Sequence, residues 1–239
     1  MKLPVSCWQC DIDGVPLFKT QRMIEFNEDF RYEIDCQNGH KSIILLQQQK
    51  FEILFDIGAH AIIDGYYREA VSSFTSALER FYEFFIRVVC VSKKLDLQAL
   101  KEAWAYVAVQ SERQLGAFIF LYLQEFGNKP TLLKNDTTKF RNDVIHKGKI
   151  PNRKQAIDFG QEILNIVRPT LKALKENYSD AVSEVVHQHL TNISKPTDTT
   201  LPISTMCTAT ILSLTFNHPG HDEMSMENAI INLAQLRYT

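Results

Sequence analysis

The chain has 239 residues, of which 45% are hydrophobic and 23% are charged, and 26 Lys and Arg residues against 28 Asp and Glu residues give a net charge of -2. This composition is that of a globular protein, and it excludes a disordered chain, a coiled-coil rod and a uniformly basic, histone-like protein. The longest apolar run, residues 117–123, is too short for a membrane span, which needs about 20 residues. The start of the chain has no apolar signal-peptide core. We therefore expect a cytoplasmic protein without membrane partners.

Residues 1–48 are predicted to form a small β unit. Residues 30–35 alternate apolar and polar side chains, and a second apolar stretch, SIILLQ, follows a Cys-Gln-Asn-Gly-His turn. The Asn38-Gly39 pair in that turn favours a β-hairpin, because both residues accept a positive φ.

The cysteines indicate a metal site rather than disulfides. There are five, an odd number without a secretion signal, and three of them lie within the first 40 residues. Two residues separate Cys7 from Cys10 and three separate Cys36 from His40, so each pair can place two ligands on one tight turn. Three thiolates and one imidazole form a standard tetrahedral set for Zn²⁺, and protein ligands in all four positions predict a structural site. The competing interpretation is a group of unrelated thiols beside a surface histidine.

This ligand spacing resembles that of a zinc ribbon, and the resemblance covers about 40 residues. Zinc ribbons commonly contact nucleic acid or protein, and the sequence does not choose between the two. A β unit of this size is too small to fold alone, so the bound Zn²⁺ is expected to supply the missing stability.

Residues 49–180 are predicted to form a helical bundle, which makes the fold class mainly α. Apolar residues recur at helical spacing, and Gly65, Gly127 and Pro130 interrupt the helices. The aromatic side chains at 74, 81, 84 and 85 form a stripe that is expected to lie in the core. The expected helices cover 51–64, 68–91, 96–126 as one or two helices, 135–147, and 150–177 with a bend at Pro169.

Residues 181–239 are predicted to form a short extension of mixed α/β structure, and the sequence assigns it no role. We expect a short helix over 181–190 and a polar linker over 195–202. Residues 208–216 have the composition of a strand, and residues 225–237 have the pattern of an amphipathic helix.

The segment 141–146, RNDVIH, carries the clearest candidate chemistry. Asn142 and His146 are four positions apart and share a face of the predicted helix, while the long side chain of Arg141 can reach the same helix end. RNA brings its own nucleophile, the 2′-hydroxyl, so cleavage needs proton transfer and positive charge at the phosphorus. Histidine can move the protons and arginine can grip the phosphate, without a metal ion.

The charge around this segment supports a phosphate-binding surface. Between residues 134 and 154, seven Lys and Arg residues oppose two Asp residues, a net of +5 in a chain of net -2. The competing interpretation is a solvated helix end whose cations complement the helix dipole. The residues predicted to bind RNA are Lys139, Lys147, Lys149, Arg153 and Lys154.

The Arg-x4-His motif at a helix end, with Asn after the Arg and Gly soon after the His, resembles that of the HEPN domain. The stretch YYREAVSSFTSALERFYEFF and the long helix after the motif fit the same resemblance, which covers residues 50–178. HEPN proteins are typically all-α dimers, and many are metal-independent endoribonucleases of toxin–antitoxin, abortive-infection or other antiviral defence systems. The resemblance implies that Arg141 and His146 are catalytic, each meeting its symmetry mate across a dimer groove.

The same resemblance gives roles to two further residues. Asn142 would position the substrate, and Glu79 either braces Arg141 or lies on the bundle surface. One HEPN subgroup has a Tyr two residues after the His, where this chain has Gly148. The departure counts against that subgroup and its AMP-transferring antitoxin. The alternative function is a non-catalytic HEPN scaffold that dimerises and binds nucleic acid or protein.

Overall fold

The computed structural model describes residues 1–194, 200–215 and 220–238. The fold is mainly helical with a small β region at the N-terminus, as the sequence predicts. The chain divides into two compact units: unit 1 comprises Met1–Gln48 and Val186–Ala209, and unit 2 comprises Gln49–Val185 and Thr210–Thr239. The described residues of the expected extension 181–239 are divided between these two units.

The described residues of unit 1 form two small sheets. Strands β1 (Lys2–Val5) and β2 (Arg22–Glu25) pair in antiparallel fashion, and the short helices α1 (Trp8–Ile12) and α2 (Leu17–Thr20) lie between them in sequence. The second sheet has the order β3 (Arg31–Asp35), β4 (Lys41–Leu46), β5 (Ile203–Met206). The predicted hairpin is present as the antiparallel β3–β4 pair, and Gly39 in its turn has a φ of 81°.

The C-terminal part of the β region corrects the sequence-based prediction. Residues 208–215 form no strand, and the strand lies earlier, at β5, which pairs in parallel with β4. The local sequence does not predict strand β5, because its pairing partner β4 lies more than 150 positions earlier in the chain. The backbone of 210–214 bonds to carboxylates of unit 2 instead of to a strand. Most of the predicted linker 195–202 lies outside the described residues.

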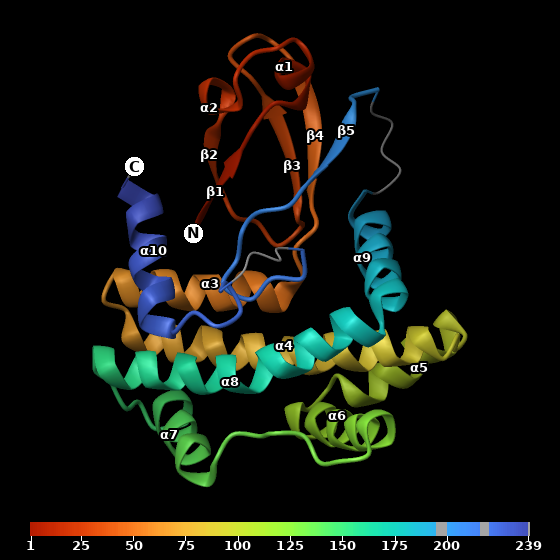
Figure 1. Cartoon of the computed structure of the whole chain (residues 1–239), viewed down its shortest axis with the longest axis vertical. Coiled ribbons are helices and arrows are strands. Elements are labelled where there is room, and N and C mark those ends of the chain that lie inside the picture. Colours follow the sequence, from red (N-terminus) through yellow and green to blue (C-terminus); the bar gives the residue numbers. More distant parts are fainter. Residues whose placement is uncertain (195–199, 216–219, 239) are drawn as a thin grey trace. The chain divides into compact units, whose positions relative to one another are not determined.

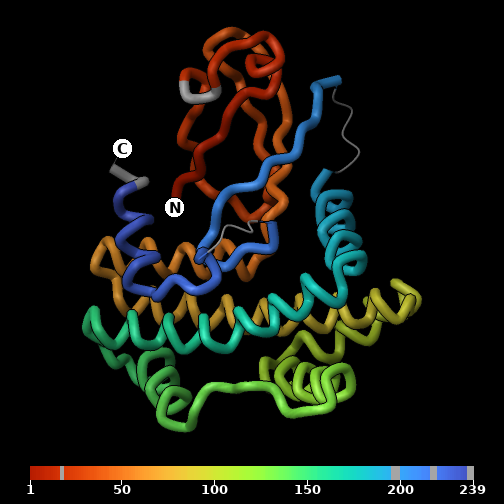
Figure 2. Tube along the Cα trace, viewed as in Figure 1, coloured from red at the N-terminus to blue at the C-terminus, as the bar shows by residue number. Residues whose placement is uncertain are grey.

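Unit 2 is a bundle centred on one long helix. The helix α4 (Tyr67–Ser92) packs against α3, α6, α7 and α8. Between α3 and α4 the chain reverses direction, with Gly65 at a φ of 82° (Figure 2). No described helix is long and apolar enough to cross a membrane. The other helices are α3 (Lys50–Ile63), α5 (Leu97–Val107), α6 (Ser111–Phe126), α7 (Asn135–His146), α8 (Arg153–Asn177), α9 (Ser179–Ser194), whose end belongs to unit 1, and α10 (Met226–Tyr238) (Figure 1).

The aromatic stripe of α4 forms the core of unit 2. Phe74, Phe81, Phe84 and Phe85 are all buried, which confirms the prediction. Phe74 packs on Phe55 of α3 with ring centroids 4.7 Å apart. Helix α8 contributes a second buried face and runs through Pro169 as a single helix. Burial of side chains of this size stabilises a fold by about 1.5–3 kcal/mol each.

Two glycines provide a test of how tightly this core is packed. A Cβ on Gly58 would lie 2.5 Å from the ring of Phe74, whereas a Cβ on Gly116 would meet no atom within 4 Å. We expect Gly58→Ala to lower the free energy of unfolding by about 1–3 kcal/mol, because the ring must move. Gly116→Ala should raise it by up to about 1 kcal/mol, because alanine favours a helix interior. Urea denaturation followed by helical circular dichroism measures both, and equal effects would contradict the close approach at Gly58.

Candidate metal centre and the segment 141–146

The first pair of ligands lies at the start of α1. Cys7 precedes the helix as its N-cap and Cys10 lies one turn later, so both thiols project from the same end. The backbone then turns back, with the Val15 amide donating to the Cys10 carbonyl at 2.8 Å and Gly14 at a φ of 77°. Both thiols are fully buried. The Cys-x2-Cys spacing therefore forms the tight turn that the sequence predicts.

The second pair lies in the β3–β4 turn. Cys36 directly follows β3 and His40 directly precedes β4. The Cys36 amide donates to the His40 carbonyl at 3.0 Å, and the Gly39 amide donates to the Cys36 carbonyl at 2.9 Å. Pairing of the two strands thus fixes the separation of the two ligands.

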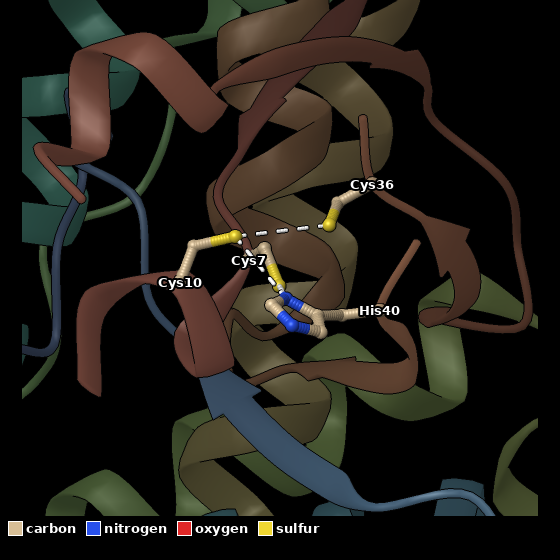
Figure 3. Close-up of side chains that lie close together, drawn as sticks. All are labelled: Cys7, Cys10, Cys36 and His40. Atoms are coloured by element: carbon tan, nitrogen blue, oxygen red, sulfur yellow. Dashed lines mark hydrogen bonds between the residues drawn. The ribbon is translucent and has the colours of Figure 1, made fainter. Parts of the chain in front are cut away.

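The four side chains converge on one point (Figure 3). Their ligand atoms all lie within 4.8 Å of one another. The Cys10 and Cys36 sulfurs are 3.7 Å apart, and His40 Nδ1 lies 3.3 Å from the Cys10 sulfur and 3.8 Å from the Cys7 sulfur. Four ligand atoms at about 2.0–2.3 Å from one ion at tetrahedral angles are separated by about 3.6–3.8 Å. Residues Cys7, Cys10, Cys36 and His40 could therefore hold a metal ion, and the described residues contain no other such group.

The surroundings shift the pKa values of Cys10 and Cys36 in opposite directions. Burial raises the pKa of Cys10 to about 11, although the Asn38 side chain, which donates to its sulfur at 3.2 Å, opposes the rise. Burial also disfavours ionisation of Cys36, but hydrogen bonds from the backbone amides of His40 and Asn38 and from the Cys10 and Cys7 thiols together outweigh it and lower the pKa of Cys36 to about 7. Several thiolates this close repel one another, so a bound cation is what would stabilise them together.

Two residues near the centre were not predicted as parts of it. The Nε2 atom of His40 lies 3.6 Å from a carboxylate oxygen of Asp13, while Nδ1 faces the sulfurs. A carboxylate behind a ligand histidine fixes its orientation and increases its basicity. Asn38 acts on Cys10 in the same indirect way. Asp13 lies three residues after Cys10, but only the tertiary structure brings its side chain to His40.

Asp13→Asn tests this indirect contact. We expect the affinity for Zn²⁺ or Co²⁺ to fall by about 10–100-fold, because the histidine loses its carboxylate partner. The matched control is Asp11→Asn, which removes the same charge from an exposed position on α1. Competition with a chromophoric chelator measures both affinities, and equal losses in the two variants would contradict a specific role for Asp13.

The segment 141–146 lies at the C-terminal end of α7. Val144 is fully buried and anchors the helix, while His146 is exposed in the last turn. Asn142 and His146 differ by about 40° around the helix axis, whereas Arg141 and His146 differ by about 140°. Asn142 and His146 therefore lie on the same face of the observed helix α7, as the sequence predicts. Arg141 belongs to a different side of α7.

Arg141 faces α4. Its Nε atom is buried and has no hydrogen-bond partner among the described residues. Burial raises the pKa of Glu79 on α4, and the charges of Arg141 and Arg80 oppose that rise. Tyr82 responds to the same two groups: burial and the charge of Glu79 raise its pKa, while Arg141 opposes them. Glu79 and Arg141 are thus electrostatic neighbours, although no ion pair within 4.0 Å joins them in the described part of the chain.

The surface around α7 carries less net positive charge than the sequence of residues 134–154 indicates. All five residues predicted to bind RNA are exposed. Three of them pair with carboxylates: Lys147 with Asp143 at 2.8 Å, Arg153 with Glu227 at 2.8 Å and Lys154 with Asp158 at 2.6 Å. Lys149 lies over the ring of Phe140, 4.9 Å from its centroid.

Folding brings extra acidic groups to this surface. Lys134 pairs with Glu162 at 3.5 Å, in addition to the pairs made by Arg153 and Lys154. The three carboxylates, Asp158, Glu162 and Glu227, lie outside the window 134–154. Including them leaves seven cations against five carboxylates, a net of +2 rather than +5.

The chain matches no model of a known protein family, no curated protein and no solved structure. The metal centre and the segment 141–146 are therefore the features from which a function can be inferred.

Proposed function

We propose that this protein is a metal-independent endoribonuclease of HEPN type, with a structural Zn²⁺ in a ribbon-like unit. The observation that carries the proposal is an exposed histidine, His146, at the end of α7, a helix whose Arg141 acts electrostatically on Glu79 of the neighbouring helix. His146 would act as general acid and base on the 2′-hydroxyl and the leaving 5′-oxygen. Arg141 would stabilise the phosphorane, and Asn142 would orient the substrate.

The angular separation of Arg141 and His146 on α7 favours a site built from two chains. One copy presents the two side chains about 140° apart, so a second copy can complete the set around one phosphate. A homodimer through the helical bundle provides this arrangement. The exposed cations Lys139 and Lys149, which have no carboxylate within 4.0 Å in the described residues, would bind the flanking phosphates first.

Zn²⁺ is the metal that best fits the centre in unit 1. Three thiols and an imidazole at tetrahedral separation favour Zn²⁺ over the hard cations Mg²⁺ and Ca²⁺, which prefer oxygen ligands. With four protein ligands no position is left for substrate, so the ion would stabilise the fold without taking part in RNA cleavage. When bound, Zn²⁺ would neutralise the thiolates and cross-link α1 to the β3–β4 turn.

The biological setting follows from the same proposal. A metal-independent ribonuclease is toxic to its own cell unless it is restrained, so we propose a cytoplasmic toxin or antiviral defence role with an antitoxin or defence partner. Expression should arrest growth, and His146→Ala should relieve the arrest. The decisive experiment is cleavage of labelled RNA by the purified protein and its His146 and Arg141 variants.

A second candidate function is a non-catalytic scaffold. The observation that favours it is the neutralisation of Lys134, Lys147, Arg153 and Lys154 by carboxylates, which weakens the attraction for RNA. A scaffold would dimerise and bind a partner without cutting RNA. The cleavage assay separates the two functions, because only the ribonuclease loses an activity when His146 is replaced.

A further inference from the structure

A pair of buried carboxylates in unit 2 takes no part in the proposed function. Glu52 and Asp56 lie four positions apart on α3, so they share one face of the helix. Both side chains are buried, with 1% and 4% of their surface exposed. Acidic residues are almost never buried to this degree unless a cation or a proton compensates them.

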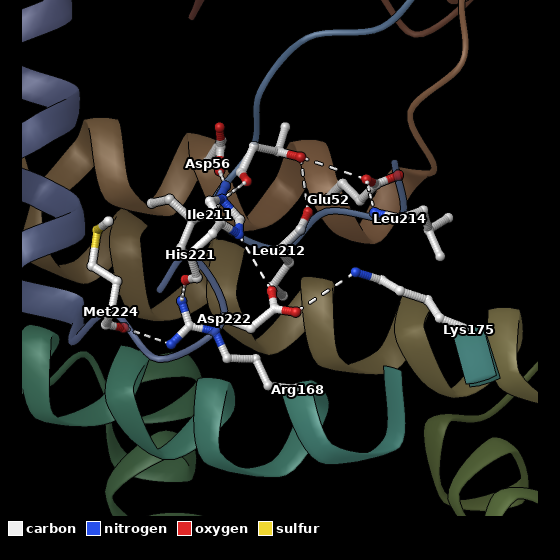
Figure 4. A network of polar contacts seen from close by, with 11 residues as sticks. Glu52, Asp56, Arg168, Lys175, Ile211, Leu212, Leu214, His221, Asp222 and Met224 are labelled. Carbon is white, nitrogen blue, oxygen red and sulfur yellow. Dashed lines mark hydrogen bonds and ion pairs between the residues drawn. The ribbon is translucent and has the colours of Figure 1, made fainter. Parts of the chain in front are cut away.

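Both carboxylates hold the backbone of the C-terminal stretch 210–215 (Figure 4). The Leu214 amide donates to Glu52 Oε1 at 3.0 Å, and the Ile211 amide donates to Asp56 Oδ1 at 3.0 Å. The Gln49 amide donates to the other Glu52 oxygen at 2.7 Å. Without these contacts the buried amide of Ile211 and the part-buried amide of Leu214 would lose their hydrogen-bond partners, so the carboxylates anchor this stretch on α3.

No cation of the described residues forms an ion pair with Glu52 or Asp56, although the charge of Lys175 acts on Glu52. Lys175 on α8 is the nearest ammonium group that acts on Glu52, but it pairs with Asp222 at 3.7 Å. Arg168 donates to the carbonyl oxygens of Met224 and His221. Neither Glu52 nor Asp56 forms an ion pair within the part of the chain that the structure describes.

His221 is the remaining titratable group beside the stretch. Its Nε2 atom lies 3.0 Å from the Thr210 carbonyl, and its Nδ1 atom lies 3.3 Å from Asp222. The imidazole is therefore engaged with the backbone and with Asp222 rather than with the buried pair.

The Thr210 hydroxyl is shared between two acceptors, one of which is Glu52. Its oxygen lies 2.8 Å from the Leu212 carbonyl. The same oxygen lies 3.5 Å from Glu52 Oε1. Because the hydroxyl has one hydrogen, it donates either to the Leu212 carbonyl or to Glu52, so Glu52 shares this donor with a backbone carbonyl.

We propose that the stretch 210–215 is held on α3 by a proton-dependent latch: Glu52 and Asp56 retain protons while the stretch is docked, and their ionisation releases it. Electrostatics agree with the geometry. Burial raises the pKa of Glu52 to about 7 against the opposing amides and Lys175. Burial and the charge of Glu52 raise the pKa of Asp56 to about 7 against the Ile211 amide.

The sign of the pH dependence follows from these directions. Both pKa values are higher in the docked state than in the free chain, so docking takes up protons. The stabilising contribution is complete below the ordinary carboxyl pKa and is lost as the pH rises through about 7. Between about pH 6 and about pH 8.5, the docking equilibrium should weaken about tenfold for each carboxylate that titrates.

Hydrogen–deuterium exchange of the full chain tests the latch. Protection of the amides in 210–215, corrected for the intrinsic pH dependence of exchange, should fall at least tenfold between about pH 6 and about pH 8.5. Amides in the core of α4 should keep their protection and serve as the internal reference. Unchanged protection of 210–215 across this range would overturn the proposal.

Variants of Glu52 and Asp56 provide a second test in the same exchange experiment. In the double variant Glu52→Gln with Asp56→Asn, the amide oxygens can still accept from the backbone, so protection should become independent of pH. Glu69→Gln, at an exposed position on α4, should behave like the wild type. A pH dependence that survives in the double variant would assign it to other groups, such as His221 with Asp222, and reject the latch.

A measurement on the unsubstituted protein keeps the test independent of how the variants fold. Carboxyl-carbon NMR should show two carboxyl groups that titrate close to pH 7, well above the ordinary range of about 4. If every carboxyl group is ionised by about pH 6, the proposal fails.

Discussion

Replacing His146 with alanine should reduce RNA cleavage by about 10²–10⁴-fold, the usual contribution of a positioned general acid and base. Arg141→Lys should reduce RNA cleavage by at least as much, because lysine keeps the charge but lacks the planar pair of N–H donors that binds a phosphate. The assay uses purified protein and end-labelled RNA without added divalent cations. The products should carry a 2′,3′-cyclic phosphate and a 5′-hydroxyl, as attack by the 2′-hydroxyl requires.

The control for this prediction is His187→Ala, because His187 is also exposed but lies in unit 1. It should cleave RNA like the wild type. Mixing the His146→Ala and Arg141→Lys proteins tests the two-chain site: mixed dimers hold one intact copy of each residue and should recover part of the activity. Equal cleavage by wild type and His146→Ala, or no cleavage by wild type, would reject the ribonuclease and favour the scaffold.

Replacing Cys36 with serine should abolish metal binding and unfold unit 1. Structural Zn²⁺ sites contribute apparent binding energies of about 10–16 kcal/mol, as much as the whole stability of a typical domain. Metal analysis should find about one zinc per chain in the wild type and less than about half in the variant. Exchange protection of the β4 amides should disappear, while the helical circular dichroism of unit 2, which has its own aromatic core, should persist.

Cys207→Ser is the matched control, because it removes the same group from an exposed position outside the ligand cluster. It should keep both the zinc and the protection of β4. A chelator added to the wild type should reproduce the Cys36→Ser result, since it removes the ion without changing a residue. Stoichiometric zinc in Cys36→Ser would contradict the ligand assignment.

Local sequence patterns predicted the helices and the hairpin because their determinants are local. The alternation of 30–35 with Asn38-Gly39 specifies the β3–β4 hairpin, and helical spacing of apolar residues specifies α3 to α8. The expected strand 208–216 is absent from its described part, 208–215, for a physical reason, and residue 216 lies outside the described residues. Its alternating Thr, Ile and Leu residues suit a strand, but Glu52 and Asp56 on α3 take the amides that a neighbouring strand would have bonded.

The sequence by itself determined the four residues that could hold a metal ion, because two short spacings on two tight turns leave little freedom for Cys7, Cys10, Cys36 and His40. It also determined that Asn142 and His146 share a helix face, since that follows from helix periodicity. Only the tertiary structure decided which groups act on these residues. Asp13 reaches His40, Glu79 acts on Arg141, and Asp158, Glu162 and Glu227 neutralise a surface that is strongly basic in sequence. Electrostatic interactions depend on distance in space, and a linear pattern cannot supply the distance between residues far apart in the chain.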